Sequence, residues 1–64
     1  MRITVNGEAV ETAAGTLAAL LDELGQGDAK VATAVNEVFV PMGARGRALA
    51  PGDRVEIVSP RQGG

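Results

Sequence analysis

The sequence predicts an α+β fold in which one mixed sheet of about five strands carries one main helix across one face. Three observations indicate this fold. Segments that alternate apolar and polar residues stand at both ends of the chain, leucines with helical spacing lie between them, and turn signals separate the segments. With 64 residues the chain is long enough for one small domain.

Residues 1–11 predict an antiparallel hairpin. Residues 1–5 alternate apolar and polar side chains, which is the period of a half-buried strand. Asn6-Gly7 follows, and this pair favours a tight hairpin turn because both residues accept a positive φ. Residues 8–11 then predict a second, weaker strand.

One helix is predicted after this hairpin. Thr16 is placed to cap it, because a threonine hydroxyl accepts a hydrogen bond from a first-turn amide that has no partner within the helix. Four leucines with helical spacing share one face: Leu17, Leu20, Leu21 and Leu24. Gly25 follows where a left-handed residue ends a helix. Such a short helix is unstable alone, so we expect its leucine face to pack on the sheet.

A second short hairpin, or two short strands joined by a tight turn, is predicted in the next segment. Residues 31–35 are rich in β-branched side chains, and residues 38–40 follow after Asn36-Glu37. Phe39 is the one aromatic residue of the chain. Phe39 belongs either to a docking patch or to the core, and we expect the core, because a single aromatic within an apolar run is more often buried than exposed.

The last third of the chain predicts a loop, a turn and a final strand. Residues 42–50 have no clear period and are interpreted as a solvated loop that contains Arg45, although Leu49 is expected to reach the core. Pro51-Gly52-Asp53 is typical of a turn, because proline presets φ and glycine accepts a positive φ. Residues 54–58 alternate again and predict the last strand.

This order of elements predicts a β-grasp (ubiquitin-like) roll with the first and last strands parallel at the centre of the sheet. We divide the chain into a β-grasp domain, residues 1–59, and a flexible C-terminal Gly-Gly tail, residues 60–64. The helix covers one face of the sheet, so the open face is the expected partner surface. Val58 belongs to that face, because it alternates with Val55 and Ile57.

The tail is where chemistry is expected, and its five residues are predicted to bind a partner: Pro60, Arg61, Gln62, Gly63 and Gly64. The glycines lack a Cβ, so their backbone can enter a narrow slot in another protein. The terminal carboxylate is ionised at neutral pH and can attack the α-phosphate of a nucleotide held by a partner. Arg61 either pairs with an acidic group of that partner or is solvated.

Missing residue types exclude several functions. The chain has no Cys and no His, so a thiolate metal site, a cysteine nucleophile and the usual general base are all absent. We therefore expect neither a self-contained enzyme nor a bound metal or cofactor. A net charge of −2, without Trp or Tyr, argues against nucleic acid as a partner. No stretch is long and apolar enough for a membrane span, and a cytoplasmic protein is expected.

Five blocks of sequence, in this order and spacing, are similar to the ThiS family of small sulfur carriers, and more broadly to the ThiS/MoaD ubiquitin-like carriers. The blocks are Ile3-Thr4-Val5-Asn6-Gly7, Thr16-Leu17-Ala18-Ala19-Leu20-Leu21, Val35-Asn36-Glu37 with Val40-Pro41, Gly52-Asp53-Arg54-Val55-Glu56-Ile57, and Gly63-Gly64. Each block alone is weak, but their combination in so short a chain is specific.

The resemblance implies a role in thiamine (thiazole) biosynthesis. A ThiF-type adenylating enzyme would use ATP to adenylate the carboxylate of Gly64. A sulfur relay protein with a sulfur donor would convert the adenylate to a thiocarboxylate, and thiazole synthase (ThiG) would accept the sulfur. The carrier would then be a co-substrate and not an enzyme. The alternatives are a sulfur carrier for molybdopterin, cysteine or another sulfur metabolite, and a noncovalent β-grasp binding module.

Overall fold

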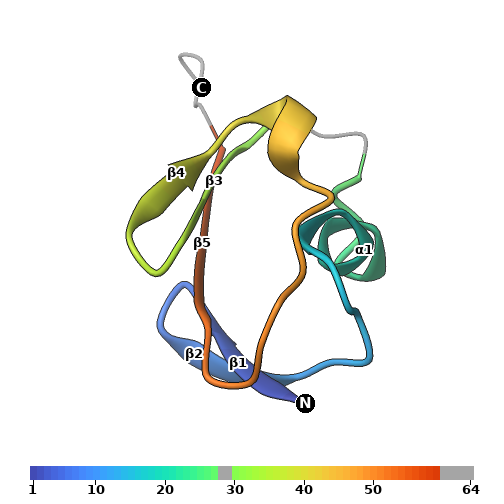
Figure 1. Ribbon diagram of the computed structural model, residues 1–64, viewed down its shortest axis with the longest axis vertical. Helices are drawn as coiled ribbons and strands as arrows, with labels where there is room; N and C mark the ends of the chain where they lie inside the picture. The colour runs from blue at the N-terminus through green and yellow to red at the C-terminus, as the bar shows by residue number, and fades with distance from the viewer. Residues whose placement is uncertain (28–29, 60–64) are drawn as a thin grey trace.

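A computed structural model describes residues 1–27 and 30–59 of the chain. Figure 1 shows a sheet with an α-helix across one side of it. The elements follow in the order β1 (Arg2–Val5), β2 (Glu8–Glu11), α1 (Leu17–Glu23), β3 (Ala32–Val35), β4 (Val38–Val40), the 3-10 helix η1 (Met42–Ala44) and β5 (Arg54–Val58). The predicted order of strands and helix is confirmed.

In the described part of the chain, five strands form one mixed sheet in the order β2-β1-β5-β3-β4. β1 and β5 are parallel, with Val5 opposite Val55, and the other neighbouring strands are antiparallel. The last strand in the sequence is therefore the central strand of the sheet. This arrangement is the predicted β-grasp roll, with its first and last strands parallel at the centre.

Both hairpins turn through residues with a positive φ, as the tightest hairpin turns require. In the β1–β2 turn φ is 52° at Asn6 and 85° at Gly7. In the β3–β4 turn φ is 52° at Asn36 and 72° at Glu37. The second turn therefore places a non-glycine residue in the left-handed region at the position where the first has glycine.

The helix begins at the predicted residue but ends before Leu24, the last leucine of the predicted face. The Thr16 hydroxyl accepts a hydrogen bond of 3.1 Å from the Ala19 amide. Three leucines are almost completely buried: Leu17, Leu20 and Leu21. The prediction that Leu24 shares their face is wrong, because the helix ends at Glu23 and Leu24 is the C-cap residue, 37% exposed. Gly25 follows with φ +77°, so the chain reverses there.

The core lies between α1 and the inner face of the sheet. The apolar residues that form it come from every strand except β2 and from the helix and loops: Ile3, Ala14, Leu17, Leu20, Leu21, Val31, Val35, Val40, Leu49, Val55 and Ile57. Leu49 reaches this core from the loop before β5, as predicted. Full burial of a leucine or isoleucine side chain contributes about 1.5–3 kcal/mol, so this small cluster supplies the main stabilising term.

The interpretation of residues 42–50 as a solvated loop is wrong at Arg45, which is buried. Its Nη2 donates to the Val31 carbonyl, and its own carbonyl accepts a 2.8 Å hydrogen bond from the Ala18 amide. The Arg47 carbonyl likewise accepts from the Leu17 amide at 3.2 Å. The loop therefore satisfies amides of the first helical turn that have no partner within the helix.

Candidate functional site

The candidate site is β5 together with the sheet face that the helix leaves open. β3 pairs with β5 in four register positions, from Val55 to Val58. β1 pairs with it in only two positions, the second of which joins Val5 to Val55. The end of β5 therefore has a continuous partner strand on one side only.

Two asparagine side chains complete the pairing of β5. The Asn6 Oδ1 accepts from the Ile57 amide at 2.8 Å, and the Asn6 Nδ2 donates to the Ile57 carbonyl at 3.1 Å. The Asn36 Oδ1 accepts from the Arg54 amide at 2.9 Å. Each asparagine thus acts as a short piece of neighbouring strand, one at each end of β5. Local sequence signals identify both asparagines only as turn residues, although their matching places in two hairpin turns are a signal of this shared role.

The turn before β5 is stabilised by the carboxylate of Asp53. Its Oδ2 accepts from the Ala50 amide at 2.9 Å, and its Oδ1 accepts from the Asn36 side chain at 3.1 Å. These hydrogen bonds, the first above all, hold the pKa of Asp53 below its usual value. The start of β5 is therefore fixed by an ionised side chain.

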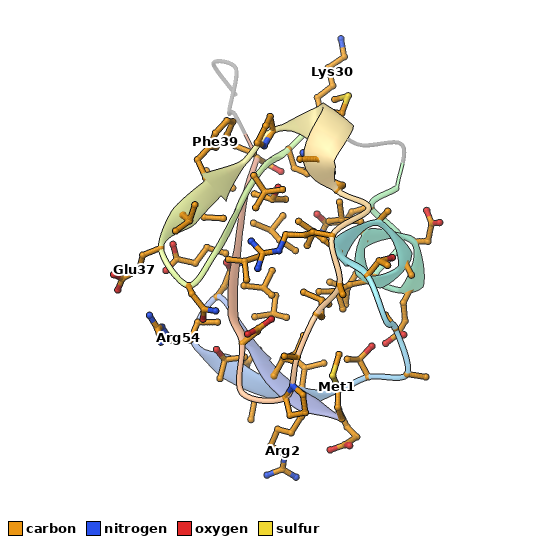
Figure 2. The ribbon with its side chains drawn as sticks, in the orientation of Figure 1. Met1, Arg2, Lys30, Glu37, Phe39 and Arg54 are labelled. Carbon is orange, nitrogen blue, oxygen red and sulfur yellow. The ribbon has the colours of Figure 1, made fainter. Side chains whose placement is uncertain are left out.

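The open face of the sheet carries exposed apolar residues near the end of β5. Val58 is 61% exposed and points away from the side on which Val55 and Ile57 are buried, as alternation predicts. Its role in partner binding stays a prediction. The prediction that Phe39 is a core residue is wrong, because Phe39 is 65% exposed. Its neighbour Val40 pairs with Thr33, and both are buried, so alternation along β4 directs Phe39 outward. Figure 2 shows Phe39 on the side of the sheet away from α1.

We call this surface the apolar patch and define it by four residues: Ala32, Ala34, Phe39 and Val58. The register makes these residues neighbours, because Ala34 lies opposite Phe39 and Ala32 lies opposite Val58. Ala32 and Ala34 of β3 lie between Phe39 on β4 and Val58 on β5. An exposed aromatic and an exposed β-branched side chain joined by small apolar residues are typical of a contact surface. Val58, at one edge of the patch, is the last residue of β5, which leads toward the predicted tail.

The rest of the open face is mostly polar, and exposed Ala9 on β2 is an exception. The Arg2 Nε lies 3.5 Å from the Glu11 Oε1, and the Arg54 Nη2 lies 3.7 Å from the Glu37 Oε2. The side chains of Arg54 and Glu37 extend to the same side in Figure 2. Exposed pairs of this kind add little stability. Glu56 is exposed on β5 between this polar half and the apolar patch. The face is therefore divided into a charged half and an apolar half.

A second surface feature lies between α1 and η1. It is an open hollow of about 460 Å³ whose lining includes Leu21, Asp22, Lys30, Met42 and Arg45, and no residue of β5 contributes to it. Among residues 1–27 and 30–59, no group of three or more potential ligand side chains is placed to hold a metal ion. No helix in the same described part of the chain is long and apolar enough to cross a membrane.

The predicted partner-binding tail lies outside the described residues, and so does the predicted modification site at its end. It comprises Pro60, Arg61, Gln62, Gly63 and Gly64. The structure describes the chain up to Ser59, directly after Val58. The only predicted site residue that the structure places is therefore Val58, within the apolar patch.

Comparison with known proteins supports the resemblance inferred from the five sequence blocks. The ThiS family model matches residues 3–64. A solved structure described as a thiamine biosynthesis protein (ThiS) from Geobacter metallireducens is similar, with 28% sequence identity and a TM-score of 0.82. The match covers 100% of both chains. No curated protein matches the chain. Because the family match spans nearly the whole sequence, the chain belongs to the ThiS family.

Proposed function

We propose that this protein is a sulfur carrier of thiamine biosynthesis and that the carboxylate of Gly64 is the group that carries the sulfur. The observation that carries this proposal is the ThiS family match, which continues through the Gly-Gly end to residue 64. The similar Geobacter metallireducens structure, which is described as a thiamine biosynthesis protein, supports the pathway. The chain has no cysteine, so no thiol side chain can carry the sulfur in its place.

The chemistry takes place on the main chain in two exchanges. A carboxylate oxygen of Gly64 attacks the α-phosphate of ATP held by a ThiF-type enzyme, and pyrophosphate leaves. Hydrosulfide, supplied from a sulfur donor through a relay protein, then attacks the acyl carbon, and AMP leaves. The resulting thiocarboxylate donates its sulfur to thiazole synthase (ThiG). The carrier is a co-substrate in each step and contributes no catalytic side chain.

The β-grasp domain presents the tail and provides the surface for docking. β5 is held by β3 and by the Asn6 and Asn36 side chains, so the tail starts from a fixed point. The apolar patch lies beside that point and suits an apolar surface on the adenylating enzyme. Docking on the patch would bring the tail near the nucleotide, and the paired charges of the other half would remain solvated.

The proposal is tested by pyrophosphate release from ATP in the presence of a ThiF-type enzyme. We expect release that depends on the carrier and that is lost when Gly64 is deleted. Glu8→Gln, an exposed change on β2, should leave it unchanged. Equal release with and without Gly64 would contradict the proposal and would favour a noncovalent β-grasp module.

A further inference from the structure

We propose that Asn6 is a site of spontaneous deamidation that the folded sheet restrains, so that modification occurs mainly when the end of β5 opens. Asn6-Gly7 forms the turn between β1 and β2, and the proposed function does not use its chemistry. The inference rests on the hydrogen bonds of Asn6 and is independent of whether the protein carries sulfur.

The reaction needs no enzyme and no co-reactant except water. The backbone nitrogen of Gly7 loses its proton and attacks the side-chain carbon Cγ of Asn6. The bond from Cγ to Nδ2 breaks, ammonia leaves, and a five-membered succinimide forms. Water then opens the ring at either carbonyl and gives aspartate or isoaspartate. Glycine in the following position favours this attack because no Cβ obstructs the approach to its nitrogen.

The folded structure opposes the first step. The Asn6 side-chain amide makes two hydrogen bonds to Ile57: its Oδ1 accepts from the Ile57 amide at 2.8 Å, and its Nδ2 donates to the Ile57 carbonyl at 3.1 Å. While these bonds persist, the side-chain amide faces β5 and not the Gly7 nitrogen. The Asn6 main-chain amide also donates to the Val55 carbonyl at 2.8 Å, which fixes the residue itself. Attack by Gly7 therefore requires local opening between the turn and β5.

The product would weaken the same contact. Aspartate in place of Asn6 has no Nδ2 donor, so its carboxylate would lie against the Ile57 carbonyl without a hydrogen bond. Isoaspartate would also lengthen the main chain of a turn whose residues both have a positive φ. Either product would loosen β5 at Ile57, next to Val58 of the apolar patch.

The chain contains a matched internal control. Asn36 occupies the same place in the other hairpin, with the same φ of 52° and a similar hydrogen bond to a β5 amide. The residue after it is Glu37, whose side chain obstructs attack by the backbone nitrogen. Asn36 should therefore remain unmodified under conditions in which Asn6 reacts.

The test is peptide mapping by mass spectrometry of the full chain, incubated at mildly alkaline pH either folded or unfolded in urea. Modification is recognised by the mass gain of replacing NH₂ with OH. We expect Asn6 to react in urea and on the order of tenfold more slowly in the folded protein, because two side-chain hydrogen bonds must break. Absence of reaction at Asn6 in urea, or equal rates in the two states, would overturn the proposal.

A second measurement tests the consequence for β5. Asn6→Asp creates the aspartate product directly, so no incubation is needed. We expect faster hydrogen exchange at the Ile57 amide, while the Leu24 amide, which donates to the Leu20 carbonyl in the helix, keeps its protection. Unchanged exchange at Ile57 would overturn the claim that modification loosens β5.

Discussion

The Asn6 side chain occupies the place of a strand residue opposite Ile57, although the two residues are 51 positions apart in the sequence. The contact extends the β1 side of β5 beyond Val5, where the parallel pairing ends. A turn residue therefore also stabilises the central strand of the sheet.

The contribution of this contact is tested by Asn6→Gly. Glycine accepts the positive φ without strain, so the substitution removes the side-chain hydrogen bonds and keeps the turn. We expect a loss of about 1–2 kcal/mol in the free energy of unfolding, measured by urea denaturation. Glu8→Ala on the same hairpin should change it by less than about 0.5 kcal/mol. Equal effects of the two variants would show that the Asn6 hydrogen bonds add no stability.

The leucine face of α1 predicts a contrast between two leucines four residues apart. Leu20→Ala should lower the free energy of unfolding by about 2–5 kcal/mol, because Leu20 is fully buried and its truncation leaves a cavity. Leu24→Ala should cost less than about 1 kcal/mol, because Leu24 is partly exposed at the helix end. Similar losses for the two variants would contradict the observed end of the helix.

The sequence predicted the strands, the hairpins and the helix start because these depend on local signals. Alternation placed Val55 and Ile57 inward and Val58 outward, and the structure agrees. The same kind of signal failed at Leu24, because spacing identifies a face but not the residue at which the helix stops. Phe39 was misplaced because composition favoured burial, whereas the strand register decides which way it points.

Contacts between distant segments were not predictable from local patterns. Arg45 lies in a segment without period, and only the folded arrangement places its guanidinium against the Val31 carbonyl. The contacts of the two asparagines with β5 depend on which strands become neighbours, and local patterns do not specify the order of strands in a sheet. The candidate site was predicted at Val58 and in the tail, whereas the aromatic member of the apolar patch, Phe39, was missed.

The apolar patch predicts a binding defect without a folding defect. Phe39→Ser should leave the free energy of unfolding almost unchanged, because the side chain is exposed. It should raise the KM of a ThiF-type enzyme for the carrier by about tenfold or more, if an aromatic anchor of the interface is lost. Ala9→Ser, an exposed change on the edge strand β2, is the matched control. The same KM for both variants would exclude the patch as the docking surface.

Asp53 predicts a dependence of stability on pH. Its pKa is lowered in the folded protein, so the ionised form stabilises the fold above the ordinary value of 3.8, and this contribution is lost as the pH falls through the lower, folded-state pKa. The free energy of unfolding should therefore decrease less on acidification in Asp53→Asn than in the wild type. Urea denaturation at neutral pH and at acid pH measures this, with Glu8→Gln as control. Parallel pH profiles for the wild type and Asp53→Asn would contradict the role of Asp53.

The most direct test of the sulfur-carrier function is the intact mass of the protein after incubation with a ThiF-type enzyme, ATP and a sulfur source. We predict a gain equal to the replacement of one oxygen by sulfur in the wild type, and no gain when Gly64 is deleted. An unchanged mass of the wild type, with the same enzyme shown to be active on its own carrier, would contradict the assignment of Gly64 as the sulfur-carrying residue.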